Sequence, residues 1–172
     1  MSSWLGRRLV AGLIDCCLVA VVGALLLAAL AGVQAAHWLT LSALGTHLAN
    51  AAVAALAGTV VLAACEASSW EATPGKLARG LRVRRYPDAA RLSFGRALAR
   101  NLIKLGLPVP LAYLAVLAAV DDGGPAAWVG VVAALVVALS YLAGLLWGDG
   151  RTAYDQVSGA MVIQALPGRR YA

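Results

Sequence analysis

The chain has 172 residues, of which 62% are hydrophobic and 13% are charged, and its mean hydropathy is +0.80. Soluble domains carry about 45–50% apolar and about 25% charged residues, and at this size they leave roughly 30% of the surface of the unfolded chain exposed. The composition therefore excludes an ordinary soluble domain. It predicts a single domain whose main solvent is lipid.

The net charge is +6, from 14 Lys and Arg against 8 Asp and Glu. The basic residues flank apolar runs and have few aromatic side chains among them on which bases could stack. This pattern predicts contact with anionic lipid headgroups and not with nucleic acid. Cys16, Cys17 and Cys65 lie inside apolar runs without metal-ligand spacing, so they are interpreted as small apolar side chains.

The first apolar run covers about residues 9–33, which exceeds the roughly 20 residues that a helix needs to cross a bilayer. Arg7 and Arg8 precede it, as they would in a cleaved secretory signal. The apolar part of such a signal has about 7–15 residues and no internal acid, whereas this run is longer and contains Asp15. The run is therefore predicted to be a membrane span.

Three further spans are predicted over about residues 48–70, 102–120 and 126–147. Pro108 and Pro110 predict a kink or a late helix start in the third span. Trp128 and Trp147 lie near the ends of the fourth, where interfacial aromatic residues are common.

The distribution of Lys and Arg predicts the topology. Basic residues occur before the first span, in the loop 71–101 and in the tail 148–172, with Lys104 at the start of the third span, and none occurs in the loops 34–47 and 121–125. The positive-inside rule then places both termini in the cytoplasm.

Thr73-Pro74-Gly75-Lys76 opens the long inner loop. Pro followed by Gly at the central positions predicts a type II turn from which Lys76 projects. The segment is not a phosphate-binding P-loop, because Leu77 follows the Lys where that motif requires Ser or Thr. A turn that only ends the second helix is the alternative.

Two further features are expected on the inner surface. After a capping Ser93, a basic stripe recurs every four residues and predicts an amphipathic interfacial helix that faces lipid phosphates; its members are Arg96, Arg100 and Lys104. The segments 80–86 and 159–164 have strand-like patterns, and they predict a small ribbon between the loop and the tail.

Asp15 and Glu66 are acids inside predicted spans. An acid there costs at least about 2.5–3.5 kcal/mol, so it should face protein or water and have a partner. Arg8 shares a helix face with Asp15 but lies roughly 10 Å away along the axis, so a third group is expected between them. The segment 149–155 supplies both charge signs. A salt-bridge network that pins the helices and a transport or binding site both remain open.

These segments together resemble the RDD family of small prokaryotic membrane proteins, named for one arginine and two aspartates. The resemblance rests on the order of residues 8–15, 73–76, 80–83, 93–101 and 151–163. It identifies the named residues as Arg8, Asp15 and Asp155, and Tyr154 stands where relatives often have His. It implies a multi-pass protein of the prokaryotic cytoplasmic (inner) membrane, and it makes cation/proton exchange a suggested activity.

The predicted fold is an all-α membrane protein with four transmembrane helices, an interfacial helix and a cytoplasmic ribbon. In the first hypothesis for its function, an ion-coupled transporter binds a cation or proton at Asp15 and Glu66, and Arg8, Arg151 and Asp155 set the carboxyl pKa and form a cytoplasmic gate. Four helices enclose little space, so a homo-oligomer or partner subunit is expected. In the second, a non-transporting module binds anionic lipid or joins a membrane complex. No enzyme, metal or cofactor is predicted, because metal-ligand spacing and a nucleophile beside a base are both missing.

Overall fold

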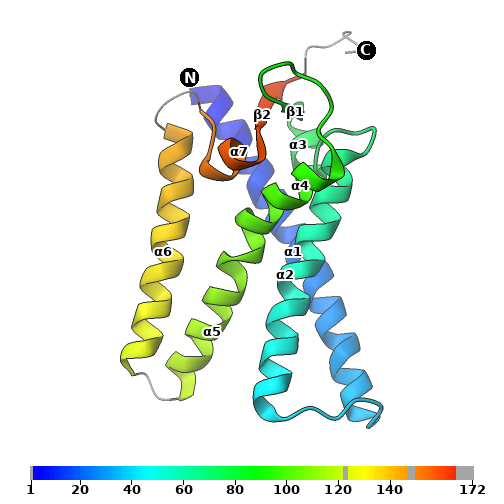
Figure 1. Cartoon of the computed structure of the whole chain (residues 1–172), viewed down its shortest axis with the longest axis vertical. Helices are drawn as coiled ribbons and strands as arrows, with labels where there is room; N and C mark the ends of the chain where they lie inside the picture. Colours follow the sequence, from blue (N-terminus) through cyan, green and yellow to red (C-terminus); the bar gives the residue numbers. More distant parts are fainter. Residues whose placement is uncertain (1, 122–123, 147–149, 166–172) are drawn as a thin grey trace.

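In the computed structural model of the chain, residues 2–121, 124–146 and 150–165 are described, and they are mostly helical (Figure 1). The elements follow in the order α1 (Ser2–Ala35), α2 (Ala43–Ala67), α3 (Pro74–Ala78), β1 (Leu81–Arg85), α4 (Phe94–Asn101), the π-helix η1 (Leu102–Gly106), α5 (Pro108–Asp121), α6 (Pro125–Leu146), α7 (Ala153–Ser158) and β2 (Ala160–Gln164). The two strands form one small ribbon, so the predicted mainly helical architecture is confirmed.

The long helices are arranged as two pairs. Helix α1 packs against α2, and α5 packs against α6. The short elements α3, α7, β1 and β2 gather at one end of the molecule together with the start of α1 (Figure 1). We call this end, formed by residues 68–101 and 150–165, the polar end.

Among the described residues, three helices are long and apolar enough to cross a membrane: Trp4–Ala35, Gly45–Ala67 and Phe94–Leu117. The third begins well before the predicted residue 102, because α4, η1 and α5 follow one another with little interruption. Helix α6 exists where the fourth span was predicted, but its described apolar stretch is shorter, Trp128–Tyr141. The four-span arrangement and the interfacial helix therefore stay predictions, and Trp147 lies outside the described residues.

The helix changes character just before Pro108. The Leu107 amide donates to the Leu102 carbonyl at 3.1 Å, five residues back, and α5 starts at Pro108. A proline inside a helix cannot donate this backbone hydrogen bond and crowds the preceding turn, so the register is adjusted in a π-helical turn. The prediction of a kink or late start here is confirmed.

The predicted ribbon is also confirmed. Strands β1 and β2 pair antiparallel, with Val83 opposite Val162 and Arg85 opposite Ala160. Val83 and Ala160 are buried in a small core with Ala63 of α2 and Leu92. The tail of the chain is thereby fixed to the loop between the second and third long helices.

The predicted type II turn at residues 73–76 is wrong. Thr73 is instead the N-cap of α3, and Pro74 is its first residue. A proline is well suited to that position, because its fixed φ is helical and the first amide needs no intrahelical partner. Lys76 consequently turns into the protein, where it is buried, and does not project from a bend.

Gly75 brings α3 into contact with α1. A Cβ atom at this position would overlap the Ala11 carbonyl oxygen and lie 2.8 Å from Oδ1 of Asp15. The space around Gly95 in α4 is open, with no atom within 4 Å of a Cβ built there. The two glycines therefore form a matched pair for testing the contact.

We expect Gly75→Ala to lower the free energy of unfolding by about 1–3 kcal/mol, because the methyl group forces α3 away from α1. Gly95→Ala should leave it unchanged or raise it by up to about 1 kcal/mol through helix propensity. Thermal melting of both variants in detergent measures the difference. Equal melting temperatures would contradict the close packing of α3 on α1.

Candidate functional site: a buried charged cluster

Three acids from distant parts of the chain meet between the long helices and the polar end. Asp15 of α1, Glu66 of α2 and Asp155 of α7 are each at most 1% exposed. Three basic side chains pair with them, and we call the six residues the charged cluster: Arg8, Asp15, Glu66, Lys76, Arg100 and Asp155.

Asp15 is held mainly by α3. The Thr73 hydroxyl donates to its Oδ2 at 2.5 Å, and the Gly75 amide donates to its Oδ1 at 2.9 Å. The Lys76 ammonium lies 3.9 Å from Oδ2. The Gly75 amide is free to donate because the first amides of a helix have no intrahelical acceptor.

Glu66 lies at the centre of the cluster. Its Oε1 accepts from Lys76 Nζ at 2.8 Å and from Arg100 Nη1, and its Oε2 accepts from Asn101 Nδ2 at 2.9 Å. Two cations and an amide from α3 and α4 therefore surround one carboxylate near the end of α2. This matches the general need of a buried acid for paired and hydrogen-bonded surroundings.

Asp155 is the third acid. Its Oδ1 accepts from Arg100 Nε at 2.7 Å, and its Oδ2 accepts from Arg8 Nη2 at 3.1 Å. The Thr152 amide and hydroxyl also donate to Oδ2, which completes a capping box at the start of α7. Burial alone would raise the pKa of Asp155, but Arg100 and Arg8 outweigh this and hold it below its usual value.

Arg100 corrects the predicted lipid-facing stripe. It is 1% exposed and joins Glu66 to Asp155, whereas Arg96 is exposed and Lys104 is half-buried. Residues four apart on an α-helix lie on one face, but the helix changes to a π-helical turn from Leu102, so Lys104 does not continue the register of Arg96 and Arg100. The two buried acids determine which of them points inward.

Arg8 makes no direct contact with Asp15, as the distance along the helix predicted. Its guanidinium extends to α7, where it pairs with Asp155, donates to the Gly150 carbonyl and lies 4.8 Å from the centroid of the Trp4 ring. Among the described residues no single group bridges Arg8 and Asp15; a series of ion pairs connects them instead, through Asp155, Arg100, Glu66 and Lys76. The hydrogen bonds to Asp15 itself come from α3. The structure still places three of the predicted acids, Asp15, Glu66 and Asp155, in one cluster.

Arg151 lies beside the charged cluster. It donates from Nε to the Ala160 carbonyl at 3.1 Å, and its guanidinium lies 4.1 Å from the centroid of the Tyr86 ring. These contacts fix the tail against the ribbon. Arg151 also donates to the Asp155 carbonyl at 3.5 Å, so it adjoins the cluster through the backbone, and its part in an ion gate stays a prediction.

The prediction missed Lys76 and Asn101 as partners of the acids. Burial lowers the pKa of the Lys76 ammonium, and Glu66 opposes that change. Lys76 therefore stays inside only because two carboxylates face it. The three basic and three acidic members of the cluster cancel, so the cluster as a whole is neutral. Within the described part of the chain, no group of three His, Cys, Asp or Glu side chains could hold a metal ion.

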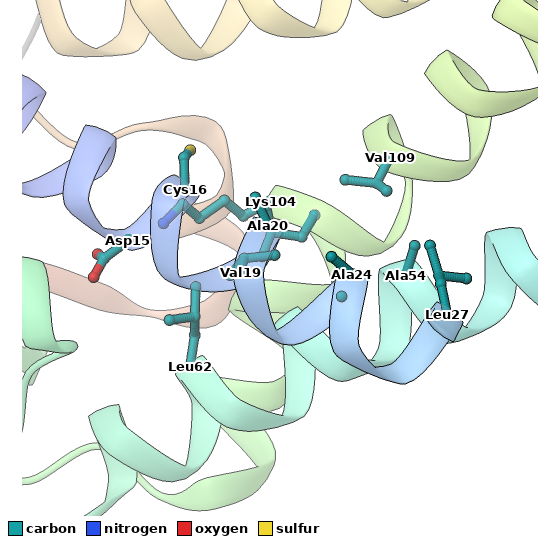
Figure 2. A pocket seen from close by; sticks show the side chains of 12 residues that line it. Asp15, Cys16, Val19, Ala20, Ala24, Leu27, Ala54, Leu62, Lys104 and Val109 are labelled. Atoms are coloured by element: carbon teal, nitrogen blue, oxygen red, sulfur yellow. The ribbon is translucent and has the colours of Figure 1, made fainter. Parts of the chain in front are cut away.

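Two hollows border the cluster. One, of about 430 Å³, lies between α1, α2 and the start of α5; Figure 2 shows Asp15 at one end and Leu27 at the other. The second, of about 470 Å³, extends toward the ribbon and is lined by Arg8, Lys76, Arg100 and Lys104 together with apolar residues. Both hollows are lined by Asp15, Cys16 and Lys104, so these three residues form the wall that the hollows share.

We expect Arg100→Met to lower the free energy of unfolding by about 3–5 kcal/mol, because Glu66 and Asp155 would then be buried with incomplete compensation. Arg96→Met, one turn away on the same helix, should change it by less than about 0.5 kcal/mol because Arg96 is exposed. Chemical or thermal unfolding in detergent compares them. A loss at Arg96 as large as at Arg100 would contradict the bridging role.

A comparison with protein families gives a match over residues 3–159, nearly the whole chain, to the model described as RDD family. No curated protein and no solved structure matches the chain. The match includes every member of the charged cluster, the α3 segment and β1. The chain is therefore a membrane-type protein with apolar helices, and it belongs to the RDD family.

Proposed function

We propose that this protein is a non-enzymatic membrane module that binds anionic lipid through its polar end, and that the charged cluster is the clamp that holds this end together. The supporting observation is the closure of the cluster. Each of its carboxylates faces a basic side chain and further donors, and all three acids are at most 1% exposed. A clamp needs this closure, whereas an ion pathway needs access to water.

The clamp joins elements that are far apart in the sequence. It fixes α7 to α1 through Arg8 and to α4 through Arg100, and it fixes α3 to α2 through Lys76. Removing one member of a buried ion pair is costly because its partner stays charged and buried. The cluster therefore maintains the relative position of the segments that carry the remaining basic residues.

The acids of the polar end are already paired. Glu71 pairs with Arg84 at 2.6 Å, and Asp88 pairs with Arg85, so all five acidic side chains that the structure describes form ion pairs. Exposed cations remain at this end, among them Arg79, Arg91 and Arg96. This surplus of positive charge suits anionic lipid headgroups. Together with the positive-inside rule, it supports placement in a prokaryotic cytoplasmic membrane with both termini in the cytoplasm.

We expect phosphatidylglycerol to raise the melting temperature of the detergent-solubilised protein more than phosphatidylethanolamine does, and added salt should reduce the difference. The double variant Arg79→Gln/Arg96→Gln should lose about 2 kcal/mol of attraction to anionic headgroups, and with it most of the preference.

The matched control is Arg85→Gln/Asp88→Asn, which alters an exposed ion pair without changing the net charge. It should keep the preference for phosphatidylglycerol. If the Arg79/Arg96 variant keeps the same preference as this control, the basic surface does not bind lipid and the proposal fails.

Cation or proton exchange is a second candidate, and the position of Asp15 favours it. Asp15 lines both hollows, and its cationic partner Lys76 is 3.9 Å away, farther than the partners of the other two acids. A cation or proton that reached this carboxylate would compete with one distant ammonium and with two neutral donors, the Thr73 hydroxyl and the Gly75 amide. Four helices enclose little space, so this function would require a second copy or a partner subunit.

If Asp15 is an exchange site, Asp15→Asn should abolish cation flux driven by a pH gradient in proteoliposomes, while Asp88→Asn at an exposed acid should leave it unchanged. If the cluster is only a clamp, Asp15→Asn should lower the melting temperature, because it leaves the cluster with an excess positive charge. A wild-type protein without flux, or flux that survives Asp15→Asn, would reject exchange at this residue.

A further inference from the structure

Lys104 lies beside the cluster but forms no ion pair with any of its carboxylates. It lies in η1, within a candidate membrane span, and is half-buried. Among the residues that the structure describes, no carboxylate lies within ion-pair distance of its ammonium. A charged side chain in a span normally faces a partner or water. The six cluster charges cancel one another, and Lys104 adds a positive charge next to them.

The hollow between α1, α2 and α5 begins at Lys104 and continues along α1 with apolar walls. Its lining runs from Asp15 to Leu27 and includes Val19, Ala20 and Ala24 (Figure 2). Twelve residues of helix rise about 18 Å, close to the depth of one leaflet of a hydrocarbon core about 30 Å thick. The hollow therefore extends over one leaflet from the level of the charges.

Small residues make this space. Gly23 is buried, yet a Cβ atom built on it meets no atom within 4 Å. Ala20 and Ala24 lie on the same side of α1. Ligand sites in proteins are concave, mostly apolar and have a few polar groups that fix orientation, and this hollow with Lys104 at its end has that form.

We propose that the two hollows form one site for a single anionic glycerophospholipid. One acyl chain would occupy the hollow along α1, and the phosphate would lie at Lys104, toward the second hollow, which Arg8, Lys76 and Arg100 also line. Charge complementarity supports this occupant, since a singly charged phosphodiester matches the positive charge of Lys104. The site deepens the proposed lipid-binding role and rests on it.

The test is native mass spectrometry of the full chain, delipidated in detergent and titrated with phosphatidylglycerol or phosphatidylethanolamine. The wild-type protein should bind one phosphatidylglycerol in preference to phosphatidylethanolamine. Gly23→Leu should weaken this binding by about tenfold or more, because the side chain displaces several methylene groups. Lys104→Gln should weaken it about fivefold, and Lys104→Arg should restore it.

Gly32→Leu is the matched control, since it places the same side chain on α1 at a position that is open but outside the hollow. It should bind as the wild type does. Melting temperatures in lipid-free detergent show that the variants fold. Because leucine is a better helix former than glycine, Gly23→Leu is not expected to destabilise α1 itself.

Three results would overturn the site. Gly23→Leu could bind phosphatidylglycerol as well as Gly32→Leu, Lys104→Gln could keep the preference over phosphatidylethanolamine, or the wild type could form a dimer that Gly23→Leu dissociates. The last result would assign the hollow to a second copy of the chain. The Arg79→Gln/Arg96→Gln variant tests the proposed function separately, because it changes the basic surface and leaves the hollow unchanged. The lipid site in the hollow can therefore fail while lipid binding by the basic surface stands.

Discussion

The architecture depends on one interaction, the bridge that Arg100 makes between Glu66 and Asp155. Both carboxylates are fully buried, and neither could remain charged there without a cation. The bridge therefore requires α2, α4 and α7 to meet at one point. The apolar faces of these helices do not by themselves impose that meeting, because in lipid they gain little by contacting each other instead of acyl chains.

The arrangement gives separate roles to Arg8, Asp15 and Asp155. Arg8 and Asp155 pair directly and tie the first helix to the tail. Asp15 has a different role, since it accepts hydrogen bonds from Thr73 and Gly75 and so holds α3 in place. By holding α3, it positions Lys76 against Glu66. Asp15 thus orders the short helix α3, and Lys76 of that helix helps to balance the charge of Glu66.

Much of the fold could be predicted from the sequence because it depends on local pattern. Long apolar runs defined α1 and α2, and alternation defined the ribbon of β1 and β2. The partners of the acids could not be predicted in this way, since pairing depends on packing between distant segments. Thr73 to Lys76 was ambiguous because the φ angle of a proline suits both a turn and a first helical residue. Charge balance was the missed signal: three buried acids need more cations than the predicted Arg8 and Arg151 supply.

The cluster charges and Lys104 have different roles. The cluster charges hold the fold together, whereas Lys104 is proposed to bind a lipid phosphate. Each cluster cation sits opposite a carboxylate of the same chain, so its desolvation is offset within the fold. Lys104 is placed at the same level, in the π-helical turn that precedes Pro108, beside two hollows. A charge in a membrane span is costly unless it has a partner or reaches water, and no carboxylate of the described residues forms an ion pair with Lys104. The phosphate of the proposed lipid would supply that partner from outside the chain.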